Sequence, residues 1–300
     1  MKSQFRNLLL GAALAAATFV PSLAGPLFAD ASTLVVRDRF SDEIVGTGPD
    51  IVFIPGLASS RETWKVEAAR LKAHYRVHLI QIAGFAGEAS RANASGAVLV
   101  PTAEAIDAYL IEQHLVPATV IGHSLGGTTI LYLAEHHPAD LKKALLVDSL
   151  PFYSTLMTGP QATVENAKPM ADAIRANPAG ATSGPRYEQT LNAMATADAD
   201  KATIRAWGKA SDSTVVVNAL ADDLTLDLRP DLAKVTTPLT LVFPDYTALG
   251  SPPGATAGMY RGAYAAVPGM KFVEVQHSLH FVMLDQPVAF DAALDDFLGK

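Results

Sequence analysis

A serine lies between two glycines in the sequence GHSLG, at residues 122–126. The apolar run before it, residues 118–121, predicts a strand, and residues 125–136 have helical spacing. At such a strand–turn–helix junction a serine is strained onto a sharp turn with its hydroxyl exposed, and flanking glycines let the strand and the helix pass closely. We therefore predict that Ser124 is a nucleophile rather than part of an ordinary glycine-rich turn.

A serine hydroxyl is a weak nucleophile until a neighbouring base takes its proton. Two histidines, His277 and His280, follow a predicted strand at residues 271–275. We favour His280 as the general base, because the longer loop lets its imidazole reach back over the sheet. His123 is adjacent to the serine, but its side chain should leave the turn in another direction, so we expect a structural role for it.

Short apolar runs alternate with longer helix-like stretches along most of the chain, which predicts an α/β fold with a mainly parallel sheet and helices on both faces. We expect strands at residues 51–54, 75–82, 118–121, 143–147, 239–243 and 271–275, and helices at 63–74, 102–115, 125–136, 256–266 and 287–298. Residues 152–228 are Ala-rich and punctuated by proline, with no convincing strand. We therefore expect a helical cap inserted there, into a core formed by residues 32–151 and 229–300.

Three segments carry a family resemblance: PGL at residues 55–57, GHSLGG at 122–127 and HFVMLDQP at 280–287. Together they resemble the α/β-hydrolase family of esterases, lipases and related enzymes, over most of the chain from about Ser32 to its end. The resemblance implies the α/β-hydrolase fold, with an inserted cap as its variable part. It also implies a catalytic triad in the chain order serine, acid, histidine.

In this family the acid usually follows the penultimate strand, where Asp245 comes directly after residues 239–243. Asp148, at the end of the preceding strand, is the position that some relatives use instead. We favour Asp245 and keep Asp148 as the alternative. For the oxyanion hole the resemblance implies the backbone N–H groups of Leu57 and Leu125, although Pro55 stands where many relatives have histidine.

These residues favour the cleavage of a small-molecule carboxylic ester through an acyl-enzyme intermediate. Acyl transfer, lactone hydrolysis and amide or peptide cleavage would use the same triad, so they remain alternatives. A non-catalytic binding protein that keeps the fold is a further alternative from another class. Cysteine nucleophiles and thiolate metal sites are excluded because the chain has no cysteine, and we expect no metal or cofactor.

The net charge of −7 and the lack of a basic run argue against a nucleic-acid partner. Lys2 and Arg6 precede an apolar run at residues 8–20, and small residues at Ser22 and Ala24 follow it. This pattern predicts a signal peptide over approximately residues 1–31 and a secreted or periplasmic protein with no stable membrane span after cleavage. An uncleaved N-terminal membrane anchor is the alternative.

Overall fold

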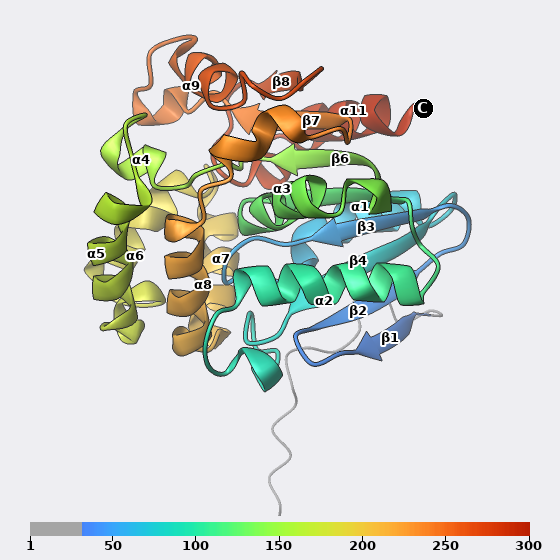
Figure 1. The fold of residues 1–300 in the computed structure, drawn as a ribbon, viewed down its shortest axis with the longest axis horizontal. Helices are drawn as coiled ribbons and strands as arrows, with labels where there is room; N and C mark the ends of the chain where they lie inside the picture. Colours follow the sequence, from blue (N-terminus) through green and yellow to red (C-terminus); the bar gives the residue numbers. More distant parts are fainter. Residues whose placement is uncertain (1–31) are drawn as a thin grey trace, which may run out of the picture.

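The computed structural model describes residues 32–300, so the predicted signal peptide lies outside the described residues. The fold is built on one eight-stranded sheet with the order β1-β2-β4-β3-β5-β6-β7-β8 (Figure 1). Strands β3 to β8 run parallel to one another, whereas β1 and β2 are antiparallel additions at one edge. The strands are β1 (Thr33–Val36), β2 (Phe40–Val45), β3 (Asp50–Ile54), β4 (Arg76–Ile82), β5 (Ala118–His123), β6 (Leu141–Val147), β7 (Leu239–Pro244) and β8 (Lys271–Val275).

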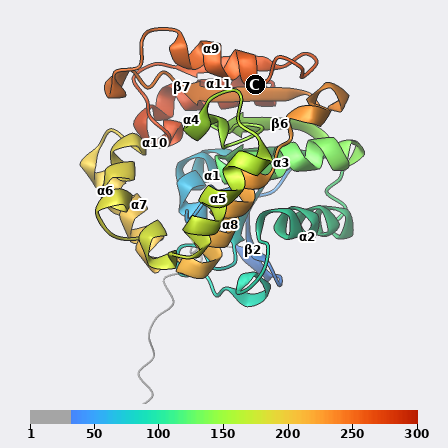
Figure 2. The same cartoon turned by 60° about the vertical axis from the view of Figure 1, so that its left-hand side comes forward.

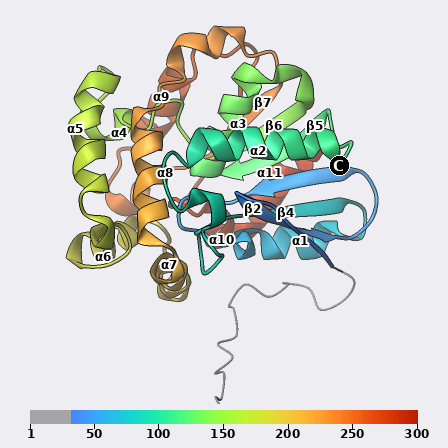
Figure 3. The same ribbon diagram turned by 60° about the horizontal axis from the view of Figure 1, so that its bottom comes forward.

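Helices cover both faces of this sheet, as the alternating pattern predicts. One buried cluster joins the sheet to α2, α3 and α9, and a second joins the opposite face to α1 and α11. Figure 3 shows α1 and α2 with strands between them. The covering helices are α1 (Lys65–Leu71), α2 (Leu99–Glu112), α3 (Leu125–His136), α9 (Ala255–Ala263) and α11 (Pro287–Leu298), with a short α10 (Val282–Asp285) before the last. The α/β-hydrolase architecture is thereby confirmed.

Residues 152–228, called the cap segment below, connect β6 to β7. The structure assigns helices and turns but no strand to these residues. Figures 1 and 2 show the helices gathered beyond one end of the sheet, with α5 and α8 side by side, and Ala171 of α5 shares a small buried cluster with Ala221 and Leu224 of α8. The helices are α4 (Thr155–Thr158), α5 (Val164–Arg175), α6 (Pro185–Thr190), α7 (Asp198–Ala210) and α8 (Ser213–Thr225).

Two strands were not predicted from the sequence, β1 and β2. The centre of β2 is polar, with Ser41, Asp42 and Glu43 all buried. Asp42 accepts hydrogen bonds from the side chains of His78 at 2.7 Å and Tyr109 at 2.8 Å, so the strand is stabilised by partners that its own sequence does not reveal. Across residues 32–300, none of the helices combines the length and the apolar character that crossing a membrane requires.

Candidate active site

Ser124 occupies a strained turn between β5 and α3. Its φ of 53° and ψ of −120° lie in a region that residues with a side chain seldom adopt. A Cβ atom on Gly122 would lie 2.4 Å from the carbonyl oxygen of Gly126, and one on Gly126 would lie 2.4 Å from that of Ile54. The glycines around the serine are therefore required by the close approach of β5, α3 and β3, as the sequence predicted.

The two predicted oxyanion donors lie beside this serine. Leu125 is the first residue of α3, where a backbone N–H group has no acceptor within the helix and the helix dipole favours negative charge. Leu57 follows β3 and lines the same cavity as Ser124. The intervening Gly56 brings this loop so close that a Cβ on it would lie 3.1 Å from the Cβ of Ser124.

His280 pairs with Asp148, which corrects the preference for Asp245. Asp148 follows β6 directly, its φ is 46°, and its Oδ2 atom lies 2.5 Å from Nδ1 of His280. The side chain of Asp245 instead accepts hydrogen bonds from Thr247, at 2.8 Å from the hydroxyl and 3.3 Å from the N–H group. The alternative that the sequence left open, Asp148, is the carboxylate that contacts the imidazole.

Asp245 stabilises the loops at the ends of β7 and β8. Burial opposes the ionisation of Asp245, but hydrogen bonds from His277, Thr247 and Ser278 outweigh this effect and lower its pKa. These partners hold the carboxylate in a turn without directing it at His280. The other histidine of the loop, His277, has a φ of 58°, and its carbonyl oxygen accepts a hydrogen bond from Gln286 at 3.1 Å.

Two tyrosine hydroxyls complete the surroundings of Asp148, and the sequence analysis did not identify either. Tyr246 donates to Oδ2 of Asp148 at 2.5 Å, and Tyr260 of α9 donates a short hydrogen bond to Oδ1. Burial and the neighbouring carboxylate raise the pKa of both phenols well above the usual value, so both remain protonated donors. Only the position of Tyr246, next to a predicted strand end, could have suggested such a role.

His123 is structural, as expected. Its ring is fully buried and lies 4.5 Å from the ring of His280 between centroids. Nε2 of His123 lies 3.0 Å from the carbonyl oxygen of His280, which it can reach only as a donor, whereas Nδ1 is buried without a partner. Burial and the neighbouring His280 lower the pKa of His123 well below its usual value. A neutral ring thus holds the backbone of the loop that carries His280.

The cap segment is also bonded to the loop of His280. The carbonyl oxygens of Ala193 and Met194 accept the backbone N–H groups of His280 at 3.2 Å and Phe281 at 2.8 Å. The carboxylate of Asp285 accepts two bonds from Thr196 and one from the N–H group of Leu279, at 2.7, 2.7 and 2.8 Å. Residues 193–196 of the cap segment therefore take part in positioning His280.

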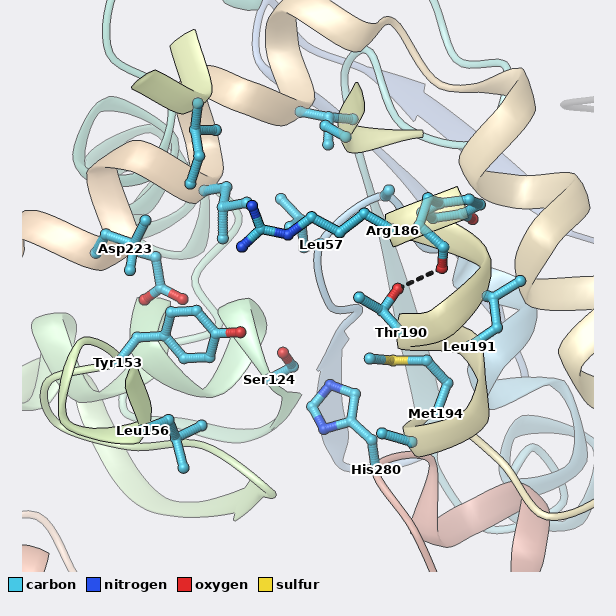
Figure 4. Close-up of a pocket in the computed structure, with 18 of the residues that line it drawn as sticks. Leu57, Ser124, Tyr153, Leu156, Arg186, Thr190, Leu191, Met194, Asp223 and His280 are labelled. Carbon is cyan, nitrogen blue, oxygen red and sulfur yellow. Dashed lines mark hydrogen bonds between the residues drawn. The ribbon is translucent and has the colours of Figure 1, made fainter. Parts of the chain in front are cut away.

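Ser124 and His280 face one cavity between the sheet and the cap segment. Its volume is about 740 Å³, and Figure 4 shows Ser124 and His280 next to each other at its wall. The cap segment supplies mostly apolar lining, including Leu156, Met157, Met170, Met194 and Leu220. Such a lining suits an apolar acyl or alcohol group near the serine.

A second group of ionisable side chains lies outside the residues that line this cavity. Asp107, His137 and Asp140 have ligand atoms within 4.8 Å of one another, an arrangement that could hold a metal ion. Both ring nitrogens of His137 already lie near carboxylates, Nδ1 at 3.6 Å from Asp107 and Nε2 at 3.1 Å from Glu104. We therefore interpret this group as a cluster of ion pairs.

Known proteins resemble this chain over different lengths. A segment of 109 residues is 30% identical to a pimeloyl-(acyl-carrier protein) methyl ester esterase of Vibrio vulnificus, and covers 36% of this chain and 40% of that relative. The chain thus spans less than half the length of this relative. The enzyme of the same name from Nitrosomonas europaea is 26% identical over 264 residues, which cover 84% of this chain and 97% of the relative.

Solved structures share the fold at low sequence identity. A hydrolase from Pseudomonas aeruginosa matches 91% of this chain and 100% of its own, with a TM-score of 0.70 at 19% identity. The enol-lactonase from Burkholderia xenovorans matches 87% and 96%, with a TM-score of 0.69 at 20% identity. The model of the alpha/beta hydrolase family matches residues 51–293, a span that includes the nucleophile turn, the cap segment and the loop of His280. The protein belongs to the alpha/beta hydrolase family, an assignment that supports an enzyme of the hydrolase class.

Proposed function

We propose that this protein is a serine hydrolase that cleaves carboxylic esters of small molecules through an acyl-enzyme intermediate. Ser124 is the nucleophile, His280 the general base and Asp148 the carboxylate that orients the imidazole. The observation that carries the proposal is the shared cavity, in which a strained serine and a histidine paired with a carboxylate line the same wall. A non-catalytic protein would have no need of this combination.

The reaction follows from the bonds around His280. Asp148 holds Nδ1 of the imidazole as a donor, which leaves the lone pair of Nε2 free to accept the proton of the Ser124 hydroxyl. The serine oxygen attacks the acyl carbon, and the N–H groups of Leu57 and Leu125 stabilise the negative oxygen that forms. The imidazolium then protonates the leaving alcohol. In the second half, His280 takes a proton from water, the water oxygen attacks the acyl carbon, and the imidazolium protonates the Ser124 oxygen as the acid leaves.

The names of the relatives favour an ester over the other acyl substrates. The relative that aligns along most of the chain is named as a methyl ester esterase, and the largely apolar cavity suits an acyl chain or a hydrophobic alcohol. Lactones are the second candidate, because an enol-lactonase shares the fold. A comparison of nitrophenyl esters of short and long acids with lactones and aminoacyl amides separates these substrates by kcat/KM.

A fluorophosphonate probe tests the nucleophile directly. We expect one equivalent of label on Ser124 in the purified protein and none in Ser124→Ala. Ser183→Ala is the matched control, since this serine also lines the cavity but lies in the cap segment. Labelling that persists in Ser124→Ala, or its absence in the folded wild type, would contradict the proposal.

We further propose that residues 1–31 direct export, on the basis of the basic, apolar and small-residue pattern alone. Fractionation of cells that express the full chain, with mass spectrometry of the mature N-terminus, tests this proposal. We expect a shortened chain in the periplasm or medium. A full-length chain in the membrane fraction would instead support an N-terminal anchor.

A further inference from the structure

Asp223 is a buried carboxyl group in the wall of the active-site cavity. It lies on α8 of the cap segment, is 7% exposed, and its Oδ1 atom has no hydrogen-bond partner. Its neighbours along the helix, Ala221 and Leu224, are buried and apolar. An ionisable group in such a place costs stability unless something pairs with it, so its presence calls for a role beyond packing.

Within the described part of the chain, no cationic side chain forms an ion pair with Asp223. The guanidinium of Arg175 pairs with the adjacent Asp222, at a distance of 2.9 Å. Asp222 also accepts a hydrogen bond from the N–H group of Val98 at 2.6 Å. The pKa of Asp223 is raised to about 7, mainly by burial; a hydrogen bond from the Thr128 hydroxyl opposes the rise and the charge of Asp222 adds to it. A positive charge brought into the cavity would supply the partner that the protein does not.

Tyr153 provides the second half of a cation site. Figure 4 shows the carboxyl group of Asp223 beside the ring of Tyr153, with the phenol directed toward Ser124. No hydrogen bond occupies the Tyr153 hydroxyl in the described structure, and burial with the nearby Asp223 charge raises the pKa of this phenol to about 12. A cation held against a neutral aromatic face and a carboxylate gains from both.

Arg186 is the cationic side chain that must be weighed against this assignment. Its side chain reaches from α6 across the cavity toward the side of Asp223 and Tyr153, as Figure 4 shows, but it forms no ion pair with Asp223 in the described structure and is exposed, so water screens its charge. Asp223 is buried, and an interaction with its carboxylate is screened much less. Because the charge of Arg186 is screened more than that of Asp223, a positively charged substrate group is favoured beside Asp223.

We infer that Asp223 and Tyr153 form a subsite for a cationic substrate group, a protonated or quaternary amine, beside the nucleophile. The inference rests on the proposed hydrolase and names its substrate class. Because the subsite lies in the cavity wall a short way from Ser124, the cation belongs to the acyl chain or the alcohol of the ester that is cleaved.

Pairs of esters that differ only in charge test the subsite. A trimethylammonium group and a tert-butyl group have nearly the same shape, so choline butyrate is compared with 3,3-dimethylbutyl butyrate. Nitrophenyl esters of ω-trimethylammonio and ω-tert-butyl acids make the same comparison on the acyl side. Nitrophenyl esters of ω-carboxy acids test whether Arg186 instead favours a negatively charged acyl group. We expect at least about a tenfold higher kcat/KM for the cationic member of one series, the equivalent of about 1.4 kcal/mol.

Asp223→Asn should bring that ratio close to one, whereas Asp200→Asn, which removes a charge from α7 outside the cavity lining, should leave it unchanged. In the wild type the preference should also rise between pH 6 and 8, because the quaternary amine keeps its charge while Asp223 ionises. This second measurement applies even if Asp223→Asn does not fold. Equal rates for the charged and neutral esters, or a preference for the anionic series, would overturn the inference and leave the hydrolase proposal intact.

Binding separates the two proposals if no ester is hydrolysed. Failure of both turnover and Ser124 labelling would refute the hydrolase. Calorimetry with hexyltrimethylammonium would still support the subsite if Asp223→Asn weakened binding about tenfold, and would refute it if the two proteins bound this probe equally.

Discussion

Replacement of Asp148 and Asp245 by asparagine, one at a time, provides a direct test of the triad. Asp148 lies 2.5 Å from the imidazole of His280, whereas the described contacts of Asp245 are with Thr247 and the loop at the end of β8. We expect Asp148→Asn to abolish most of the activity and Asp245→Asn to leave most of it.

The size of the first effect follows from the bonds at Asp148. The carboxylate accepts from His280 and Tyr246 on one oxygen and from Tyr260 on the other. An asparagine can keep its oxygen toward His280 and donate its N–H group to the Tyr260 hydroxyl, which can also accept. The variant should therefore fold while the charge that stabilises imidazolium is lost. We expect kcat to fall by about 10³ to 10⁴, or about 4 to 5.5 kcal/mol in the barrier.

Asp245→Asn should instead affect the turn after β7. An amide oxygen can still accept the Thr247 hydroxyl, but bonds to an ionised acceptor become neutral ones, a change of about 1 kcal/mol in the free energy of unfolding. We expect kcat/KM within about tenfold of the wild type, or about 1.4 kcal/mol in the barrier, because the described side-chain bonds of Asp245 do not involve Ser124 or the imidazole of His280.

Steady-state kinetics with a nitrophenyl ester gives both values, and circular dichroism melting shows whether each variant is folded. Folded Asp245→Asn protein with the larger loss of kcat would refute the assignment of Asp148. Equal losses in both variants would contradict the expected difference between the two carboxylates.

Three further changes test other parts of the structure. Tyr260→Phe removes one of the hydrogen bonds that hold the carboxylate of Asp148 beside His280, so kcat should fall by about tenfold in steady-state assays; an unchanged kcat contradicts this. Burial raises the pKa of Glu67 from 4.5 to about 8, so between these pH values the unfolded chain loses a proton that the folded protein keeps. The free energy of unfolding should therefore fall as pH rises from about 4.5 to 8, and Glu67→Gln should flatten that fall in urea titrations. Asp285→Asn weakens the bonds between the cap segment and the loop of His280, so hydrogen exchange should speed up in both segments while a distant strand exchanges as before.

The sheet, the strained turn at Ser124 and the placement of His280 at the same cavity were predictable because each has a local signal. Apolar runs mark the buried parallel strands, and glycines at fixed spacing mark the turn at Ser124. Strand β2 has no such signal, because the partners of its buried Asp42 come from β4 and α2. An apolar strand can therefore be recognised from its own residues, whereas a buried polar strand such as β2 is stabilised by residues that are distant in the sequence.

The choice between Asp148 and Asp245 could not be made from the sequence for the same reason. Both follow adjacent parallel strands, β6 and β7, so both reach the same edge of the sheet. Their side chains are separated by the turns that follow, since Asp148 has a positive φ and Asp245 is held by Thr247. Tyr260 comes from α9, more than a hundred residues after Asp148. Neither the turn geometry nor this contact has a signature in composition or spacing.

The bonds between residues 193–196 and the loop of His280 limit how this enzyme could be re-engineered. A chimera that received the whole of residues 152–228 from a relative would exchange one wall of the cavity and the contacts that hold the loop of His280 together. Grafts confined to α4 and α5 would alter the shape of the cavity while the contacts of Met194 and Thr196 stayed in place. Libraries for altered specificity should therefore diversify the first half of the insertion and retain the native residues from Leu191 to Thr196.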